Sequence, residues 1–489
     1  MSGLKNSLKH NLVKENVAME KEEKKIYSPS EEKFIRHFSD NFDEISRHDF
    51  PEAKQMRQQA METFRQSGFP DKTFERWRNT DPKGIFPKNM EIFDAEVPYE
   101  KKLSEIFVCE VHDFESRIIS VLNGSYYQAG EEKITIDKNG VIVGSLAKAM
   151  QKYPQLVKKH LGRIMPQQDG FKNINTALAV DGVFIYVPDN IKVENTFQII
   201  NILNKPNLAV NIRNLVILGK NSHLQLLHCD DSVNRHGGLI NKVNEVFLDE
   251  NAELELYKLQ NLNDKTTLLN QTAIDQSANS RLKINAFSLN GGMIRNEIFD
   301  LMNGENAWSD IHGLYLMDQK QHIDNQVNVF HNKPGCTSNQ LFKGILDNEA
   351  SGVFNGYIYV KRYAQQTNAF QKNSNILLTK TARIDTMPHL EIYADDVKCS
   401  HGASVGQLDE EAMFYLMQRG IPFTDARMLI MYAFTDVIIK EISIEPLRIS
   451  IEDMVKRRLR GDLSICDRCV LHCSHPDQPV IFDIDMNKI

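Results

Sequence analysis

Asp249-Glu250-Asn251-Ala252-Glu253-Leu254-Glu255-Leu256 decides the fold, because a polar turn and a small residue lead directly into an alternating strand. The small residue returns at Ser222, Ser280 and Ala307, roughly 27 to 30 positions apart, which is the spacing of stacked units. Looser copies of the turn include Ala350 and Ala382. The repeat predicts a mainly β protein whose middle is a β-solenoid. A large β-sandwich with irregular loops is the alternative.

Composition bounds the class of protein. The chain has 489 residues, too many for one ordinary core unless part of it is a repeat array. Its 58 basic and 65 acidic residues give a net charge of -7, which gives no reason to expect nucleic acid or an anionic membrane as a partner. No apolar run is long enough to span a membrane, and residues 1–30 contain no apolar signal core, so we expect a cytoplasmic protein. Four of the seven cysteines are scattered and three cluster near the end, and this low, uneven usage argues for reduced thiols rather than a disulfide framework.

Changes in the pattern of apolar, charged and cysteine residues divide the chain into five parts. The apolar spacing from Glu32 onward, with Phe50-Pro51 as a helix start and Gly68 as its end, predicts helices. The predicted parts are a flexible charged lead (1–30), an N-terminal helical region (31–107), a β-helix core (108–404), a C-terminal helical domain (405–461) and a cysteine-rich tail (462–489).

The C-terminal region carries helix start and stop signals. Asp409 is a predicted N-cap, with Arg419 near the end of the helix and Gly420 as its stop. Thr424 is predicted to cap the next helix, which is apolar on several sides and must therefore be sandwiched. Ser450, followed three residues later by an aspartate, predicts the start of a third helix.

Cys399 and His401 lie two residues apart just before these helices. On an extended strand this spacing places both side chains on one face, where a thiolate and an imidazole could meet one metal or sulfur species. Both ligand types suit iron and zinc. Simple packing of the two side chains in a β protein is the alternative.

The surrounding sequence resembles a known family. The stretch Asp385-Thr386-Met387-Pro388-His389-Leu390-Glu391-Ile392-Tyr393-Ala394-Asp395-Asp396-Val397-Lys398-Cys399-Ser400-His401-Gly402-Ala403 is similar to the most distinctive segment of the SufB/SufD family, scaffold subunits of the SUF iron–sulfur cluster assembly machine. Cys-Ser-His-Gly-Ala resembles the SufD branch rather than SufB, which typically has an acidic residue beside the histidine. Met387 and Asn79 depart from the pattern, which commonly has lysine and tyrosine at these positions.

The resemblance implies both a fold and a site. The fold is a right-handed parallel β-helix flanked by helices at both ends. The histidine matching His401 lies where SufD meets its paralogue SufB, at the proposed place of cluster assembly, and Cys399 matches a neighbouring cysteine. The resemblance therefore implies a transient iron–sulfur cluster, or iron, at the junction of two chains.

The resemblance also implies an ATPase partner. The segment from Leu408 to Glu441 is similar to the family region that docks the ABC-type ATPase SufC. The chain has no Gly-x-x-x-x-Gly-Lys-Ser/Thr motif for nucleotide phosphates, so we expect a non-catalytic scaffold with ATP hydrolysis in the partner. Helices that merely cap the solenoid are the alternative. The candidate docking residues are Asp409, Phe414, Arg419, Arg427, Tyr432 and Phe434.

The tail contains a second candidate metal site. Cys466, Cys469, Cys473 and His475 could supply four ligands to zinc or to an iron–sulfur cluster. The cluster lacks a second well-spaced pair of ligands, and a reduced tail with labile thiols is the alternative.

Two other functions compete with the SufD-like scaffold. One is a self-associating SufB-like scaffold, and a homodimer in isolation would also fit a SufD-like chain. The other is a β-helix enzyme acting on polysaccharide, for which Asp395-Asp396 is the candidate carboxylate pair. Adjacent strand residues point to opposite faces, and no secretory signal is visible, so the enzyme is disfavoured. The tryptophan Trp77 is expected to be an anchor within the fold rather than a recognition residue.

Overall fold

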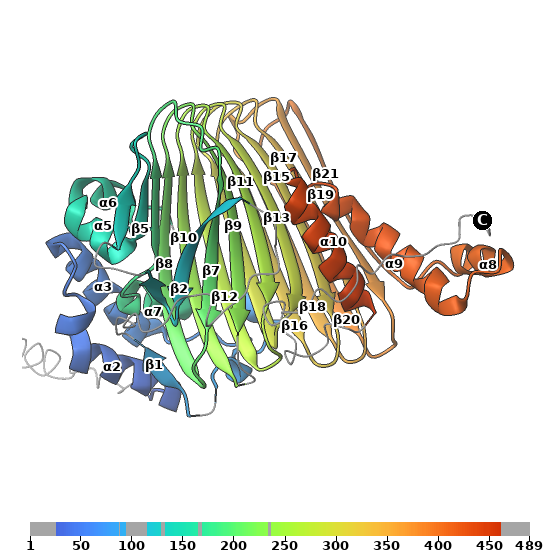
Figure 1. The fold of residues 1–489 in the computed structure, drawn as a ribbon, viewed down its shortest axis with the longest axis horizontal. Helices are drawn as coiled ribbons and strands as arrows, with labels where there is room; N and C mark the ends of the chain where they lie inside the picture. The colour runs from blue at the N-terminus through green and yellow to red at the C-terminus, as the bar shows by residue number, and fades with distance from the viewer. Residues whose placement is uncertain are drawn as a thin grey trace, which may run out of the picture.

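A computed structural model gives the structure of the protein, and it describes residues 26–87, 89–93, 115–128, 133–164, 169–232 and 236–460. Helices lie at both ends of a long stack of strands (Figure 1). The N-terminal helices are α2 (Pro29–Ile45) and α3 (Pro51–Ser67), followed by the 3-10 turns η1 (Glu75–Trp77) and η2 (Pro82–Gly84).

The predicted start and end of α3 are confirmed. Pro51 occupies its first turn, where the missing N–H costs no hydrogen bond, and Gly68 ends it with a φ of 70°. The preceding helix begins with a capping box in which the Ser28 hydroxyl accepts from Glu31 N–H and the Glu31 carboxylate accepts from Ser28 N–H.

Short elements lead from these helices into the solenoid. They are β1 (Glu91–Phe93), β2 (Ser116–Leu122), β3 (Ser125–Tyr127), β4 (Ile134–Ile136), β5 (Ile142–Ser145), α5 (Leu146–Lys152), α6 (Pro154–His160) and α7 (Gly170–Leu178). The three helices lie inside the range 108–404 that the sequence suggested as β-helix, and no repeat corner falls on them. Regular stacking of parallel strands begins after them, at β6 (Val183–Val187).

The middle of the chain is a parallel β-solenoid, as predicted. Successive strands alternate between two sheets, and each strand pairs in parallel with the strand two places along the chain. The sandwich alternative is therefore wrong. The solenoid strands after β6 are β7 (Thr196–Leu203), β8 (Leu208–Leu218), β9 (His223–Ser232), β10 (Gly238–Leu248), β11 (Glu253–Asn261), β12 (Thr266–Gln276), β13 (Arg281–Asn290), β14 (Met293–Met302), β15 (Trp308–Met317), β16 (His322–His331), β17 (Thr337–Leu346), β18 (Ser351–Val360), β19 (Thr367–Leu377), β20 (Arg383–Ile392) and β21 (Val397–Gly406).

Asparagines explain the repeated corners. Asn221 and Asn251 adopt left-handed backbone conformations, with φ of 54° and 57°, and asparagine tolerates this region better than most residues. The Asn251 amide donates to the Asn221 side chain across 2.8 Å, and Asn221 donates to Asn190 in the same way. The small residue after each asparagine, such as Ala252, is fully buried under the turn. Each coil thus supports the next through its corner.

The interior of the solenoid is not purely apolar. Isoleucine, leucine and valine fill most of it, but a row of hydrogen-bonded asparagine side chains also runs along it. Each side chain in the row donates to the next across 2.8 to 3.1 Å, which satisfies amides that would be costly to bury alone. The row consists of Asn214 and Asn244, which pair in register, and of Asn270, Asn296 and Asn325, which also pair in register but lie two residues out of step with the first two.

Trp77 anchors the N-terminal region to the outer face of one sheet. Its ring is buried, and the Arg295 guanidinium lies 4.0 Å from the ring centroid. Arg295 also pairs with Glu297 and Asp324, both on the solenoid, so the cation is compensated on two sides. The prediction of an internal anchor is confirmed.

Three helices follow the solenoid: α8 (Glu410–Gln418), α9 (Phe423–Ile439) and α10 (Glu445–Leu459). Asp409 caps α8 as predicted, accepting from Ala412 N–H across 3.0 Å. Two predicted caps are wrong. Helix α9 already begins at Phe423, so Thr424 lies inside it, and Ser450 lies in the middle of α10, which starts with Glu445-Pro446.

Candidate functional site

The open end of the solenoid carries the candidate site. Strands β20 and β21 are the last members of their sheets, so each has one edge without a partner strand among the described residues. Apolar side chains are exposed on this final coil, including Met387, Tyr393 and Val405. An unpaired, partly apolar strand edge is a ready template for a strand of another chain.

Cys399 and His401 lie on β21, on the same side of the strand. In the parallel register Cys399 pairs with Ala369 and His401 with Gln371, and both partners face the buried interior. The two candidate ligands therefore line the mouth of the solenoid together, one coil above the last closed layer. Ser400 between them is exposed on the outer side.

The two side chains differ in environment. Cys399 packs against a small apolar cluster that includes Ile358 and Ala369, and this burial raises the pKa of its thiol above the usual value. His401 is exposed and lines a hollow of about 390 Å³ that is formed by β17, β19 and β21. The histidine is therefore the more accessible ligand, and the cysteine needs a metal or a base to become a thiolate.

The described residues contain no group of three or more histidine, cysteine, aspartate or glutamate side chains able to hold a metal. Cys229 and Cys336 are buried and far apart in sequence, and neither joins Cys399. A metal at the mouth would need ligands from outside this part of the chain. Cys466, Cys469, Cys473 and His475 lie outside the described residues.

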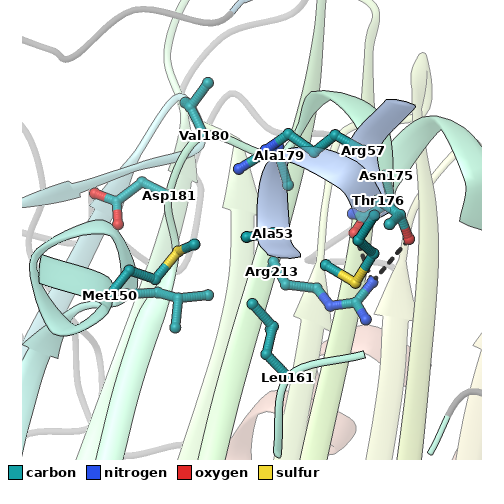
Figure 2. A pocket seen from close by; sticks show the side chains of 12 residues that line it. Ala53, Arg57, Met150, Leu161, Asn175, Thr176, Ala179, Val180, Asp181 and Arg213 are labelled. Atoms are coloured by element: carbon teal, nitrogen blue, oxygen red, sulfur yellow. Dashed lines mark hydrogen bonds between the residues drawn. The ribbon is translucent and has the colours of Figure 1, made fainter. Parts of the chain in front are cut away.

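A smaller cavity lies near the other end of the solenoid (Figure 2). Its volume is about 20 Å³, enough for a single water molecule, and it is closed by α3, α5 and α7. Arg213 donates to the side chains of Asn175 and Thr176 at its edge, as the dashed lines in Figure 2 show, and pairs with the buried Glu245. These contacts tie the helices to the sheet, so this cavity is structural.

The aspartate pair suggested for an enzyme also has a different setting. Asp395 and Asp396 lie in the turn between β20 and β21 and not on a strand, so the alternation of side chains does not apply to them. Asp396 instead continues the corner stack, because its N–H donates to the Gln365 side chain and its carbonyl accepts from Gln366 N–H. The turn explains this pair without catalysis.

The predicted docking residues divide into two groups. Asp409, Phe414 and Arg419 are the N-cap, a helical residue and the C-cap of α8, which stands away from the sheets beyond the last coil (Figure 1). Phe414 is 65% exposed, and Arg419 reaches back to the Tyr415 ring and hydroxyl. Tyr415, Met417 and Phe423 extend this exposed apolar surface. In the sequence, only the apolar run around Phe414 indicated such a surface.

The other predicted residues face the solenoid. The Lys343 ammonium donates to Phe434 carbonyl and lies 4.4 Å from the Phe434 ring, which holds α9 on the sheet. Tyr432 packs against α10, with Lys456 over its ring, and Arg427 lies 3.9 Å from Asp347. The inner half of α9 and the length of α10 cover apolar residues of the β7–β21 sheet, as a sandwiched helix requires.

Comparison with known proteins identifies the family. The SUF system FeS cluster assembly SufBD core domain matches residues 201–434, and the SufBD protein N-terminal region matches residues 28–199. The chain belongs to the SufBD family. It is 30% identical over 299 residues to an iron–sulfur cluster assembly SufBD family protein of Synechocystis, covering 59% of this chain and 66% of the relative.

Two relatives are named iron–sulfur cluster assembly protein SufD. The Escherichia coli protein is 40% identical over 176 residues, 36% of this chain and 42% of the relative. The Bacillus subtilis protein is 26% identical over 327 residues, 66% of this chain and 74% of the relative. The match thus spans less than two thirds of the E. coli protein's length. The family prediction made from residues 385–403 is confirmed, and the core match includes Cys399 and His401. No helix in the described part of the chain is long and apolar enough to cross a membrane.

Proposed function

We propose that this SufBD family protein is a SufD-like, non-enzymatic scaffold subunit for iron–sulfur cluster assembly. The observation that carries the proposal is the open last coil, where Cys399 and His401 share the inner face of a strand that has one unpaired edge among the described residues. Two ligands are half of a tetrahedral site, and the described residues offer no others nearby. The remaining ligands then come from a second chain, and the cluster or iron is cargo held at the junction.

The edges of β20 and β21 are the proposed contact with a SufB-like paralogue. A partner strand added to each edge would continue both sheets and bury the exposed Met387, Tyr393 and Val405. The same edges would serve a second copy of this chain, which is the self-associating alternative. Co-expression with SufB-like and SufC-like proteins, followed by the mass of the purified complex, separates a heteromer from a homomer.

Helix α8 and the first turns of α9 are the proposed dock for a SufC-like ATPase. Their exposed Phe414, Tyr415 and Phe423 form an apolar surface that stands clear of the solenoid. A hollow of about 550 Å³ lined in part by Thr424, Arg427 and Met428 lies beside them, between the helices and the sheet. Apolar and aromatic side chains at such a surface are typical of an interface core.

The helices also link the dock to the cluster site. Helix α9 reaches from the exposed surface to the β17 region, where Lys343 holds Phe434, and β17 is two strands from β21 in the same sheet. Movement of an ATPase bound at α8 would therefore act on strands next to the mouth. In this proposal ATP hydrolysis occurs in the partner and remodels the junction.

The test is His401→Ala in the full chain with its partners present. We expect normal folding and complex formation with a lower yield of assembled cluster, read from iron and sulfide content and the visible absorption of the purified complex. Ser400→Ala is the matched control, because this neighbour lies on the outer side of the same strand. A normal cluster yield in the His401→Ala complex would refute the role of the histidine.

A further inference from the structure

One buried amide beneath the mouth of the solenoid is only half satisfied. Strand β19 directs three amide side chains inward: Gln371, Asn373 and Asn375. Asn373 donates to Tyr315 Oη and to Phe342 carbonyl, and its Oδ1 accepts from Asn375. Gln371 donates through Nε2 to Gln340 Oε1 across 2.7 Å, yet its own Oε1 has no hydrogen-bond partner among the described residues.

This unpartnered oxygen calls for an explanation, because Gln371 is only 3% exposed. Buried carbonyl oxygens are nearly always hydrogen-bonded, since losing the bond to water without replacement costs free energy. A site that needs an acceptor in one of its states is one reason to keep such a group.

Three residues border the Gln371 amide. Gln340 lies directly below it in the register, in the preceding coil. Gly356 lies across the interior, so close that a Cβ there would come within 2.1 Å of Gln371 Nε2 and 2.6 Å of its Oε1. His401 lies directly above it in the register of β19 and β21, and both side chains line the same hollow.

We propose that Gln371 is a positioning residue for His401. In the proposed arrangement the His401 ring turns inward so that one ring N–H donates to Gln371 Oε1, and the other ring nitrogen, without a proton, then faces out of the solenoid mouth. The inference rests on the proposed role of His401 as a ligand.

The chemistry of the pair supports this arrangement. A neutral imidazole has one N–H donor and one nitrogen acceptor, and an amide oxygen can only accept, so the contact selects one tautomer. Histidines that bind metals usually donate their second ring N–H to an oxygen in this way, which fixes the ring and makes the ligating nitrogen more basic. Cys399 has no equivalent support, because the residue below it is Ala369.

The test is nuclear magnetic resonance of the full chain with labelled histidine rings, with the His401 signal assigned by its loss in His401→Gln. In the unmodified chain we expect one dominant tautomer. Gln371→Glu keeps an acceptor under the ring and should preserve the same dominant tautomer. Gln371→Met removes the acceptor and should return the ring to a mixture of tautomers.

Asn373→Leu is the matched control, because it removes a buried amide from the same strand but pairs with Ala403 instead of the histidine. It should leave the dominant tautomer of His401 unchanged. If Gln371→Glu does not fold, Gln371→Met still decides the question.

The inference is overturned if His401 in the unmodified chain is a mixture of tautomers, or if the folded Gln371→Met variant keeps the same dominant tautomer. That readout needs neither cluster nor partner. It is therefore separate from the cluster yield of His401→Ala, which judges the proposed function.

Discussion

Replacing Asp300 by asparagine should stabilise the protein, and more so at higher pH. The Asp300 side chain is fully buried inside the solenoid, where its carboxyl oxygens accept from Ser309 and Gln276. Burial raises the pKa of this carboxyl from 3.8 to about 6, because the interior disfavours the charged form and no cation compensates it. A shift of roughly 2 pKa units corresponds to about 3 kcal/mol.

The direction with pH follows from this raised pKa. The folded chain holds a proton on Asp300 that the unfolded chain releases near pH 3.8, so stability is lost as the pH rises through about 6. Asparagine resembles the protonated carboxyl, since its amide can donate to Ser309 and its oxygen can accept from Gln276. The gain in unfolding free energy should therefore be about 3 kcal/mol at pH 7.5 and should fall toward zero near pH 4.

Denaturant unfolding followed by circular dichroism at several pH values between 4.5 and 7.5 measures this difference. Glu253→Gln is the control, because this carboxylate is exposed at a strand start and its loss should change stability little at any pH. An Asp300→Asn gain that does not depend on pH, or a loss at pH 7.5, would show that burial of the charge is not what limits stability there.

Three further predictions concern the N-terminal anchor, the proposed dock and the cysteine-rich tail. Arg295→Met should cost about 3–5 kcal/mol in thermal or denaturant unfolding, because it leaves the buried Asp324 carboxylate without its cation and Glu297 with Lys172 alone. A smaller loss would mean that Trp77 packing alone anchors the N-terminal region. Phe414→Glu should weaken binding of a SufC-like ATPase roughly tenfold or more in calorimetry, whereas Ile449→Glu, at an exposed position on α10, should not. Equal affinities of the two variants for the ATPase would refute the dock proposed at α8. Truncation after Gly461 should lower the zinc or iron content of the purified chain, and an unchanged content would remove the proposed tail site.

The repeat in sequence predicted the solenoid because the physical requirement is local. Each coil needs a residue that tolerates a positive φ and a small residue to pass under the turn, and Asn251-Ala252 supplies both. The side chains of Cys399 and His401 lie on one side of their strand for an equally local reason, the alternation of side chains.

Features that depend on the stacking of coils could not be predicted from the sequence. Asn270 and Asn296 look like surface residues of a strand, and they are buried only because asparagines of neighbouring coils align with them. The sequence did not indicate that Gln371 lies beneath His401, since this position follows from the exact length of one coil. The missed start of α9 at Phe423 has a related cause: apolar residues pack the helix on the sheet, so a cap at Thr424 is not needed.

The asparagine corners have a consequence for how the molecule can change in evolution. Asn221 and Asn251 stand in equivalent positions, so one complete coil could be lost or duplicated and the corner bonds would form again between the new neighbours. Each such event would move the two ends by one strand spacing, about 4.8 Å. The number of coils therefore sets the distance between the anchored N-terminal helices and the open mouth, and a change in that number leaves the chemistry of each end intact.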